Sequence, residues 1–186
     1  MSQLRFSRQL LGLLAVLCFS AVAQGQASVY GAIALTASGV SPAASSSNYY
    51  FKSGAPGFVA GGFYNFPIQS RLTAGLDLRI VNGPGTKGGT ASSLALRIGF
   101  VPDVVRLRPY FEIGGGVVST STNAELVNDG VPAGTYTGGA AMIAFGLDIR
   151  ITHRIDFRLL DIGSEANGSN GMVYANSGIV YHFGAR

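Results

Sequence analysis

Residues 71–81 read RLTAGLDLRIV, and this stretch decides the fold because its apolar and polar side chains alternate. Successive side chains of a β-strand point to opposite faces, so every second residue shares a face. One face carries Leu72, Ala74, Leu76, Leu78 and Ile80, and the other carries Arg71, Thr73, Gly75, Asp77 and Arg79. The period of two therefore predicts a strand with one apolar and one charged face.

Alternation of this kind recurs along the chain and predicts eight strands. They are Val29–Ala37, Gly57–Phe66, Leu72–Val81, Ser92–Val101, Tyr110–Ser119, Tyr136–Arg150, Ile155–Ile162 and Val173–Phe183. The connections alternate in length: Ser38–Pro56, Asn82–Ala91, Thr120–Thr135 and Gly163–Met172 are long, and Pro67–Arg71, Pro102–Pro109 and Thr152–Arg154 are shorter. Transmembrane β-barrels of the bacterial outer membrane show this asymmetry, with long loops outside the cell and short turns in the periplasm.

The volumes of the two faces distinguish a membrane barrel from a soluble one. In the third, fourth and sixth predicted strands, one face is bulky and apolar, whereas the other is mostly Gly, Ala, Ser and Thr interrupted by charges. A soluble barrel points its bulky apolar residues inward, but the narrow lumen of an eight-stranded membrane barrel suits small and polar ones. We therefore predict an all-β, eight-stranded antiparallel up-and-down transmembrane barrel, with a soluble lipocalin-like ligand-binding barrel as an alternative.

In a membrane barrel the charged face must line the lumen, because a lipid-facing Arg or Lys costs roughly 2–4 kcal/mol near the midplane. The predicted lumen charge network comprises Arg71, Asp77, Arg79, Arg97, Glu112, Asp148, Arg150, Asp156 and Arg158. Buried charges need partners of opposite sign. If Ile151 opposes Ile155 around a three-residue turn, Arg150 faces Asp156 and Asp148 faces Arg158. A periplasmic aromatic girdle is predicted from Phe66, Phe100, Phe111 and Phe157, with Tyr181 and Phe183 nearby.

The N-terminal segment, residues 1–23, is predicted to be a cleavable signal peptide. It has Arg5 and Arg8 without an acid, then an apolar run that ends in small residues. Cleavage after Ala23 or after Ala27 fits the small-residue rule, and we assign residues 24–186 to the barrel. The chain's single cysteine, Cys18, lies in the signal, so no disulfide is expected in the barrel. Only 12% of the residues are charged and no Lys/Arg run is present, so no nucleic-acid partner is expected.

The last predicted strand carries a motif that resembles the β-signal of outer-membrane proteins. Asn176 supplies the polar residue, Gly178 the glycine, and Tyr181 and Phe183 the terminal aromatics. With the glycine-rich stretch Tyr110–Gly116, this motif makes the chain resemble the OmpA-type family of small outer-membrane β-barrels. The resemblance implies an outer-membrane location, contact with its lipids and lipopolysaccharide, and recognition by the barrel-assembly machinery. The chain departs from the family in the three residues after Phe183, and no peptidoglycan-binding domain is expected after the barrel.

No catalytic, cofactor-binding or metal-binding residue is predicted. The two histidines, His153 and His182, fall at the periplasmic side, away from substrates at the outer surface, and nothing in the sequence has metal-ligand spacing. We therefore predict a non-enzymatic, monomeric barrel with a plugged polar lumen and no cofactor. Its four extracellular loops would serve envelope structure, adhesion or binding, and Tyr49, Tyr50 and Phe51 are the candidate contact patch. A small outer-membrane channel is the other alternative.

Overall fold

The computed structural model describes residues 26–40, 50–51, 54–68, 71–84, 89–102, 106–121 and 134–183. The strands in these ranges are β1 (Gln26–Val40), β2 (Tyr50–Phe51), β3 (Ala55–Pro67), β4 (Leu72–Asn82), β5 (Gly89–Phe100), β6 (Leu107–Ser121), β7 (Thr135–Arg150), β8 (Ile155–Ala166) and β9 (Asn170–His182). No helix in the described ranges is long and apolar enough to cross a membrane. The predicted signal peptide, residues 1–23, lies outside the described residues.

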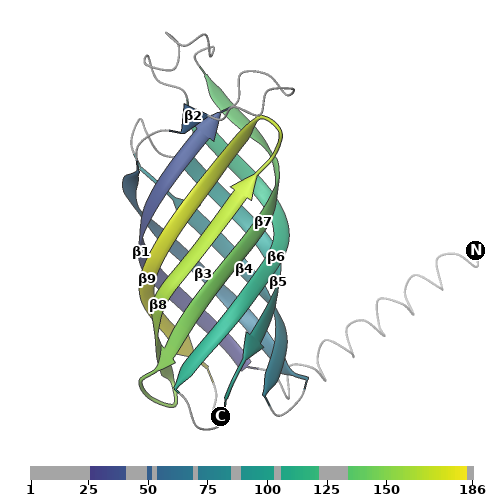
Figure 1. The fold of residues 1–186 in the computed structure, drawn as a ribbon, viewed down its shortest axis with the longest axis vertical. Coiled ribbons are helices and arrows are strands. Elements are labelled where there is room, and N and C mark those ends of the chain that lie inside the picture. The colour runs from purple at the N-terminus through teal and green to yellow at the C-terminus, as the bar shows by residue number, and fades with distance from the viewer. Residues whose placement is uncertain are drawn as a thin grey trace, which may run out of the picture.

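The strands close into one barrel, as Figure 1 shows. Consecutive strands from β3 to β9 pair antiparallel, β1 pairs with β3, and β1 also pairs with β9 to complete the circle. The two-residue β2 pairs with the last residues of β1, on the edge that β3 occupies lower down, because β9 occupies the other edge. The wall of the described barrel therefore consists of β1 and β3–β9, which confirms the predicted closed, eight-stranded up-and-down architecture.

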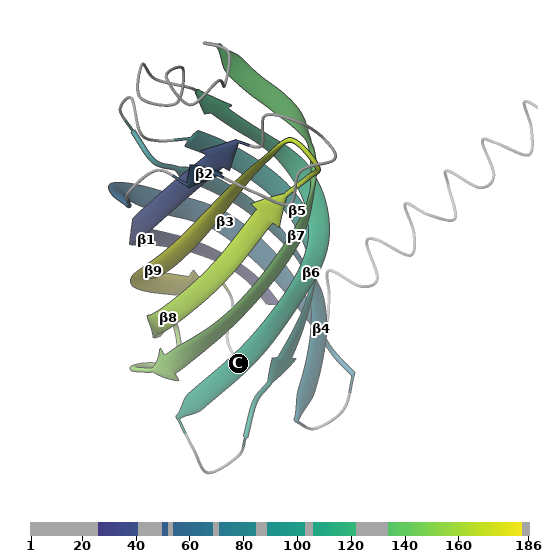
Figure 2. The same cartoon turned by 45° about the horizontal axis from the view of Figure 1, so that its top comes forward.

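The two ends of the barrel differ in their connections, and we name them by their place in Figure 1. The lower end carries the β3–β4, β5–β6 and β7–β8 connections, the start of β1 and the end of β9. The upper end carries the β1–β3, β4–β5, β6–β7 and β8–β9 connections. Tilted strands surround the barrel axis between the two ends (Figure 2).

One predicted connection is wrong. The segment Gly163–Met172 is not a long loop, because β8 and β9 continue into it and leave three residues between them. The Asn167 side chain closes this turn by accepting hydrogen bonds from the backbone N–H groups of Ser169 at 2.7 Å and Asn170 at 2.9 Å. Asn commonly makes tight turns in this way. The upper end therefore has a tight β8–β9 turn in place of the fourth predicted loop.

Bulky apolar side chains cover the outside of the barrel. Ile33 is 79% exposed and Leu78 is 60% exposed, although such residues are buried in most soluble proteins. We call the exposed set the apolar belt: Val29, Ile33, Leu35, Phe58, Leu76, Leu78, Ile80, Leu94, Leu96, Ile98, Ile113, Val117, Ile143, Phe145, Leu159, Leu160, Ile162, Val173 and Ile179. Each wall strand contributes to the belt, so it surrounds the barrel.

The inward face of β3 could not be assigned from the sequence, and the structure assigns it. Val59 and Phe63 point into the lumen and are buried, whereas Phe58 lies outside and is half exposed.

The lumen also contains large side chains, which corrects the expectation that its residues other than the charges are mostly small. Tyr30, Phe63, Tyr110, Met142, Met172 and Tyr174 are all buried in it. Each of the three tyrosines has a glycine as its cross-strand partner: the pairs are Tyr30–Gly61, Tyr110–Gly146 and Tyr174–Gly163. A Cβ atom on any of these glycines would overlap the tyrosine ring. The missing side chain on one strand therefore provides the space for the ring on the other.

Candidate functional site

A closed ring of alternating charges lies inside the barrel. It is built from Arg79 of β4, Arg97 of β5, Glu112 of β6, Asp148 of β7, and Arg158 and Asp161 of β8. The N···O distances around it are 2.6 Å for Glu112–Arg97, 3.1 Å for Arg97–Asp148, 3.0 Å for Asp148–Arg158, 3.3 Å for Arg158–Asp161, 3.0 Å for Asp161–Arg79 and 2.5 Å for Arg79–Glu112. All six side chains are buried. We call them the charge ring.

Strand register brings most of this ring together. Arg97 lies directly opposite Glu112, and Asp148 lies directly opposite Arg158. Asp161 joins them because of a β-bulge in β8, where Leu159 and Leu160 both point outward. The extra residue of a bulge changes which later residues face inward. Asp161 thus faces the lumen although it is three residues after Arg158.

Tyrosine and phenylalanine rings enclose the charge ring. The Tyr30 hydroxyl donates to Asp77 at 2.8 Å and accepts from Nε of Arg79 at 3.0 Å. The Arg97 guanidinium lies 3.4 Å from the centroid of the Tyr110 ring and 4.2 Å from that of Phe63. Contacts with aromatic faces stabilise desolvated guanidinium groups. The centre of the lumen is therefore filled by paired charges and the rings packed on them.

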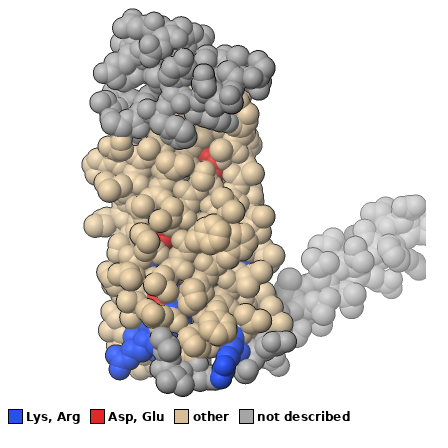
Figure 3. All heavy atoms as spheres, viewed as in Figure 1, with Lys and Arg blue, Asp and Glu red and all other residues tan. Residues whose placement is uncertain are grey.

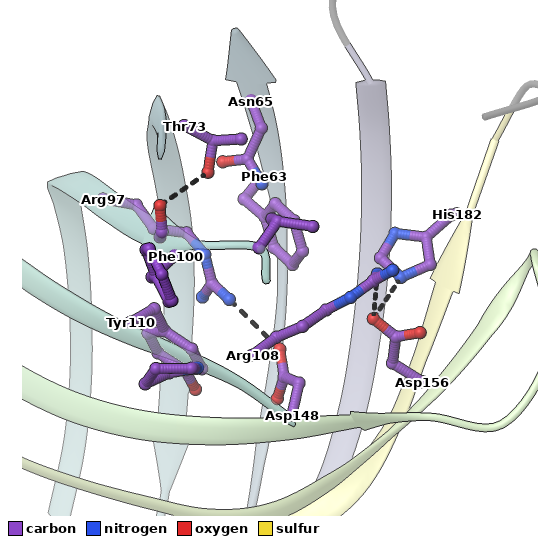
Figure 4. A pocket seen from close by; sticks show the side chains of 13 residues that line it. Phe63, Asn65, Thr73, Arg97, Phe100, Arg108, Tyr110, Asp148, Asp156 and His182 are labelled. Carbon is purple, nitrogen blue, oxygen red and sulfur yellow. Dashed lines mark hydrogen bonds and ion pairs between the residues drawn. The ribbon is translucent and has the colours of Figure 1, made fainter. Parts of the chain in front are cut away.

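A second cluster lies at the lower end of the lumen, where β8 begins and β9 ends, and Figure 4 shows its Asp156 with Arg108 and His182. The Asp156 carboxylate accepts a hydrogen bond from Arg108 at 2.8 Å and lies 2.9 Å from Nε2 of His182. The other ring nitrogen of His182 is 2.7 Å from the Ser28 hydroxyl. A cavity of about 20 Å³ opens between this cluster and Arg97, a volume that suits one water molecule.

The order Ser28–His182–Asp156 matches the order of groups in a nucleophile, base and acid relay, but two features weigh against hydrolysis. Arg108 shares the Asp156 carboxylate, so less of its negative charge is available to stabilise a protonated His182. The Ser28 hydroxyl is buried, and the neighbouring cavity is too small for an acyl substrate. The cluster is arranged to fill the lower lumen and to join β1, β6, β8 and β9. Among the described residues, no group of three His, Cys, Asp or Glu side chains could hold a metal ion.

The structure places most of the predicted lumen charges together in the lumen, but not Arg71 and Arg150. Asp77, Arg79, Arg97, Glu112, Asp148, Asp156 and Arg158 all lie buried in the lumen. Arg71 is exposed at the lower rim, because it precedes β4 in the β3–β4 connection, and its assignment to the lumen was wrong. Arg150 has the predicted register opposite Asp156, but the Asp156 carboxylate binds Arg108 and His182. The other predicted partner contact, between Asp148 and Arg158, is present.

Several lumen residues were not predicted. Asp161 and Glu165 would face lipid if β8 alternated regularly, so only knowledge of the bulge could have identified them. Arg108 precedes Pro109 in the sequence and was assigned to a turn, but β6 begins at Leu107 and turns Arg108 inward. The lumen tyrosines could have been found from the glycines that face them on the neighbouring strands, but only if the strand register had been known.

The residues predicted for the girdle and for the assembly signal occupy one part of the wall. Phe66, Phe100, Phe111 and Phe157 all lie outside the lumen, in the lower half of their barrel strands. Tyr181 and Phe183 are also exposed there, with ring centroids 5.1 Å apart. Asn176 points inward and donates to the Asp161 carbonyl at 3.2 Å, whereas Gly178 lies so close to the β1 backbone that a Cβ would collide with it. Their roles as girdle and assembly signal stay predictions.

Comparison with solved structures finds small outer-membrane barrels. Ail, the attachment invasion locus protein of Yersinia pestis, has a TM-score of 0.58 and 11% identity, over 86% of this chain and 99% of Ail. Neisserial surface protein A has a TM-score of 0.52 and 14% identity, over 84% of this chain and 97% of its own. OprG of Pseudomonas aeruginosa has a TM-score of 0.51 and 11% identity, over 87% of this chain and 97% of OprG.

No protein-family model matches the sequence, and no curated protein matches it. The similarity therefore rests on architecture alone. Closed topology, burial pattern and structural neighbours agree: this chain has the fold of the small eight-stranded outer-membrane β-barrels.

Proposed function

We propose that this protein is an integral outer-membrane barrel that is not an enzyme and that presents its upper-end loops to the outside of the cell. The observation that carries the proposal is the inverted distribution of side chains, with the apolar belt outside and the charge ring inside. A soluble monomer rarely exposes an apolar patch of more than a few hundred Å². A belt around the whole barrel is stable only where acyl chains cover it.

The charge ring has two consequences for function. It joins five strands without exposing a charge to lipid. Removing one partner of such a buried pair strongly destabilises the folded protein. The charge ring also fills the bore, which argues against a channel. Planar-bilayer recordings should show no steady conductance, whereas open steps that disappear in Arg97→Ala would revive the channel alternative.

Orientation follows from the positions of the connections. An even number of wall strands places both chain ends at the lower end, which in outer-membrane barrels is the periplasmic side. The upper-end connections 41–54 and 122–134 would then face the outside, together with the tight β8–β9 turn. Ail, which is similar in fold, is named for attachment, and we propose attachment to an external ligand as the role of these connections. We further propose a monomer in contact with outer-membrane lipid and lipopolysaccharide, inserted by the barrel-assembly machinery.

Two experiments test these proposals. Cell fractionation combined with gel migration before and after boiling tests the membrane barrel, because an intact barrel migrates differently from its unfolded chain. We expect the protein in the outer-membrane fraction with a heat-dependent shift; a soluble periplasmic chain without the shift would contradict the proposal. Replacing residues 41–49 and 122–133 by Gly/Ser segments of equal length tests attachment. Attachment of the cells to surfaces should fall while the shift is retained, and unchanged attachment would contradict this role.

A further inference from the structure

The lower rim repeats one arrangement at each of the three short connections. Arg71, Arg106 and Arg154 each occupy the last position before a strand, and each side chain is exposed. The backbone carbonyl of each arginine accepts a hydrogen bond from the neighbouring strand end: Arg71 from Val101 at 2.8 Å, Arg106 from Arg150 at 2.9 Å, and Arg154 from His182 at 2.8 Å. Their backbones are therefore fixed at equivalent places on alternate hairpins. We call these three residues the arginine rim.

The charge on the outside of the described barrel is all of one sign. The described carboxylates, Asp77, Glu112, Asp148, Asp156, Asp161 and Glu165, are all buried. The exposed charged side chains in the same ranges are those of the arginine rim, and Figure 3 shows blue surface at the lower end of the barrel. Arg150, half buried beside Arg106, adds to the same sign. The described lower rim thus presents positive charge without an exposed carboxylate.

Apolar residues follow each rim arginine directly. Leu72, Leu107 and Ile155 begin β4, β6 and β8, and the first two are about two-fifths exposed on the outer wall. An arginine at the start of such a strand stands at the boundary between hydrocarbon and water. Its guanidinium can extend to the headgroups while its methylenes stay against the apolar wall. The planar donor fork of arginine also fits a phosphate with two hydrogen bonds.

We propose that the arginine rim binds the phosphates of anionic phospholipids in the periplasmic leaflet. This inference rests on the proposed function, because it requires the barrel to span the outer membrane. The position of the arginine rim indicates a lipid as the ligand. The rim lies at the edge of the apolar belt, where the headgroups of lipids meet their acyl chains. The rim would then hold the barrel at a fixed depth, since moving it along the membrane normal would separate the guanidinium groups from the phosphates.

Spin-labelled lipids test the proposal directly. The purified full-length barrel is reconstituted in phosphatidylcholine bilayers that contain spin-labelled phosphatidylglycerol or spin-labelled phosphatidylcholine, and the motionally restricted fraction of each probe is measured. We expect the barrel to restrict phosphatidylglycerol with about twofold or greater preference, because each surface arginine attracts an anionic lipid. High salt should reduce the preference.

Variants identify the residues responsible. The triple variant Arg71→Gln/Arg106→Gln/Arg154→Gln should lose the preference, whereas Arg71→Lys/Arg106→Lys/Arg154→Lys, which keeps the charges, should retain most of it. Equal restriction of the two lipids by the unmodified protein, or an undiminished preference in the Gln variant, would overturn the inference. A heat-dependent gel shift in every sample separates the outcomes: a protein that inserts without lipid preference contradicts only the arginine rim, and one that never inserts contradicts the proposed function.

Discussion

Glu112 makes the two shortest ion pairs of the charge ring, because its two oxygens pair with Arg79 and Arg97 separately. Glu112→Gln keeps the shape and removes the charge, which leaves two buried guanidinium groups short of an anion. We expect the free energy of unfolding to fall by roughly 3–5 kcal/mol, the range for breaking a buried ion pair. Urea titration of the barrel in phospholipid vesicles measures this loss.

Glu165 provides a matched control for Glu112. It is equally buried in the same lumen, but its side chain accepts a hydrogen bond from the Ser93 hydroxyl at 3.0 Å, and its Oε2 has no hydrogen-bond partner among the described residues. Glu165→Gln should therefore change the free energy of unfolding by about 1 kcal/mol or less. Equal losses in the two variants would show that burial alone, and not pairing with arginine, decides the effect.

At the scale of the elements, neighbouring strands pack through pairs in which a tyrosine ring on one strand covers a glycine on the next. The Tyr110 ring of β6 covers Gly146 of β7 while it packs under Arg97. Gly146→Ala would push this ring into the charge ring, and we expect a loss of about 1–3 kcal/mol, as for other overpacked cores. The same substitution at Gly31, where an added Cβ meets nothing within 4 Å, should be nearly neutral in the same urea titration. A neutral Gly146→Ala would contradict the pairing.

The bulge in β8 makes a second prediction at this scale. Deleting Leu159 removes the extra outward residue and leaves Arg158 and Asp161 facing the lumen in regular alternation. Deleting Phe157 shortens the strand equally but makes Asp156 and Arg158 neighbours, so that one of them must face lipid, at a cost of up to roughly 2–4 kcal/mol on top of its lost ion pairs. We expect the Leu159 deletion to keep the heat-dependent gel shift and the Phe157 deletion to lose it. The opposite result would mean that the bulge does not set the inward residues.

The same bulge explains which parts of the lumen the sequence could predict. Regular alternation in β4, β5 and β7 predicts that Asp77, Arg79, Arg97 and Asp148 face the lumen, and all four are buried, since each strand there follows the period of two. Asp161 was missed because a bulge leaves no mark in the alternation of an apolar run such as Leu159-Leu160. Arg71 was misplaced for a related reason: alternation does not show where a strand begins.

At the scale of the whole molecule, the architecture followed from volume and from connection length. The fold could be predicted because bulky and small faces differ in every well-patterned strand, and this difference survives errors of a few residues at strand ends. The tight β8–β9 turn could not be predicted, because the polar residues from Gly163 to Asn170 are equally compatible with a loop and with the solvent-exposed end of a long strand. How far the strands extend beyond the apolar belt depends on register and not on composition.

The account depends centrally on which side chains meet lipid, and tryptophan fluorescence tests this most directly because the natural chain contains no tryptophan. Ile143→Trp places the indole on the apolar belt, and Phe63→Trp places it in the lumen beside Arg97. In bilayers of lipids brominated on their acyl chains, we predict strong quenching of Ile143→Trp and little quenching of Phe63→Trp. Quenching of Phe63→Trp with Ile143→Trp unaffected, or quenching of neither, would contradict the account.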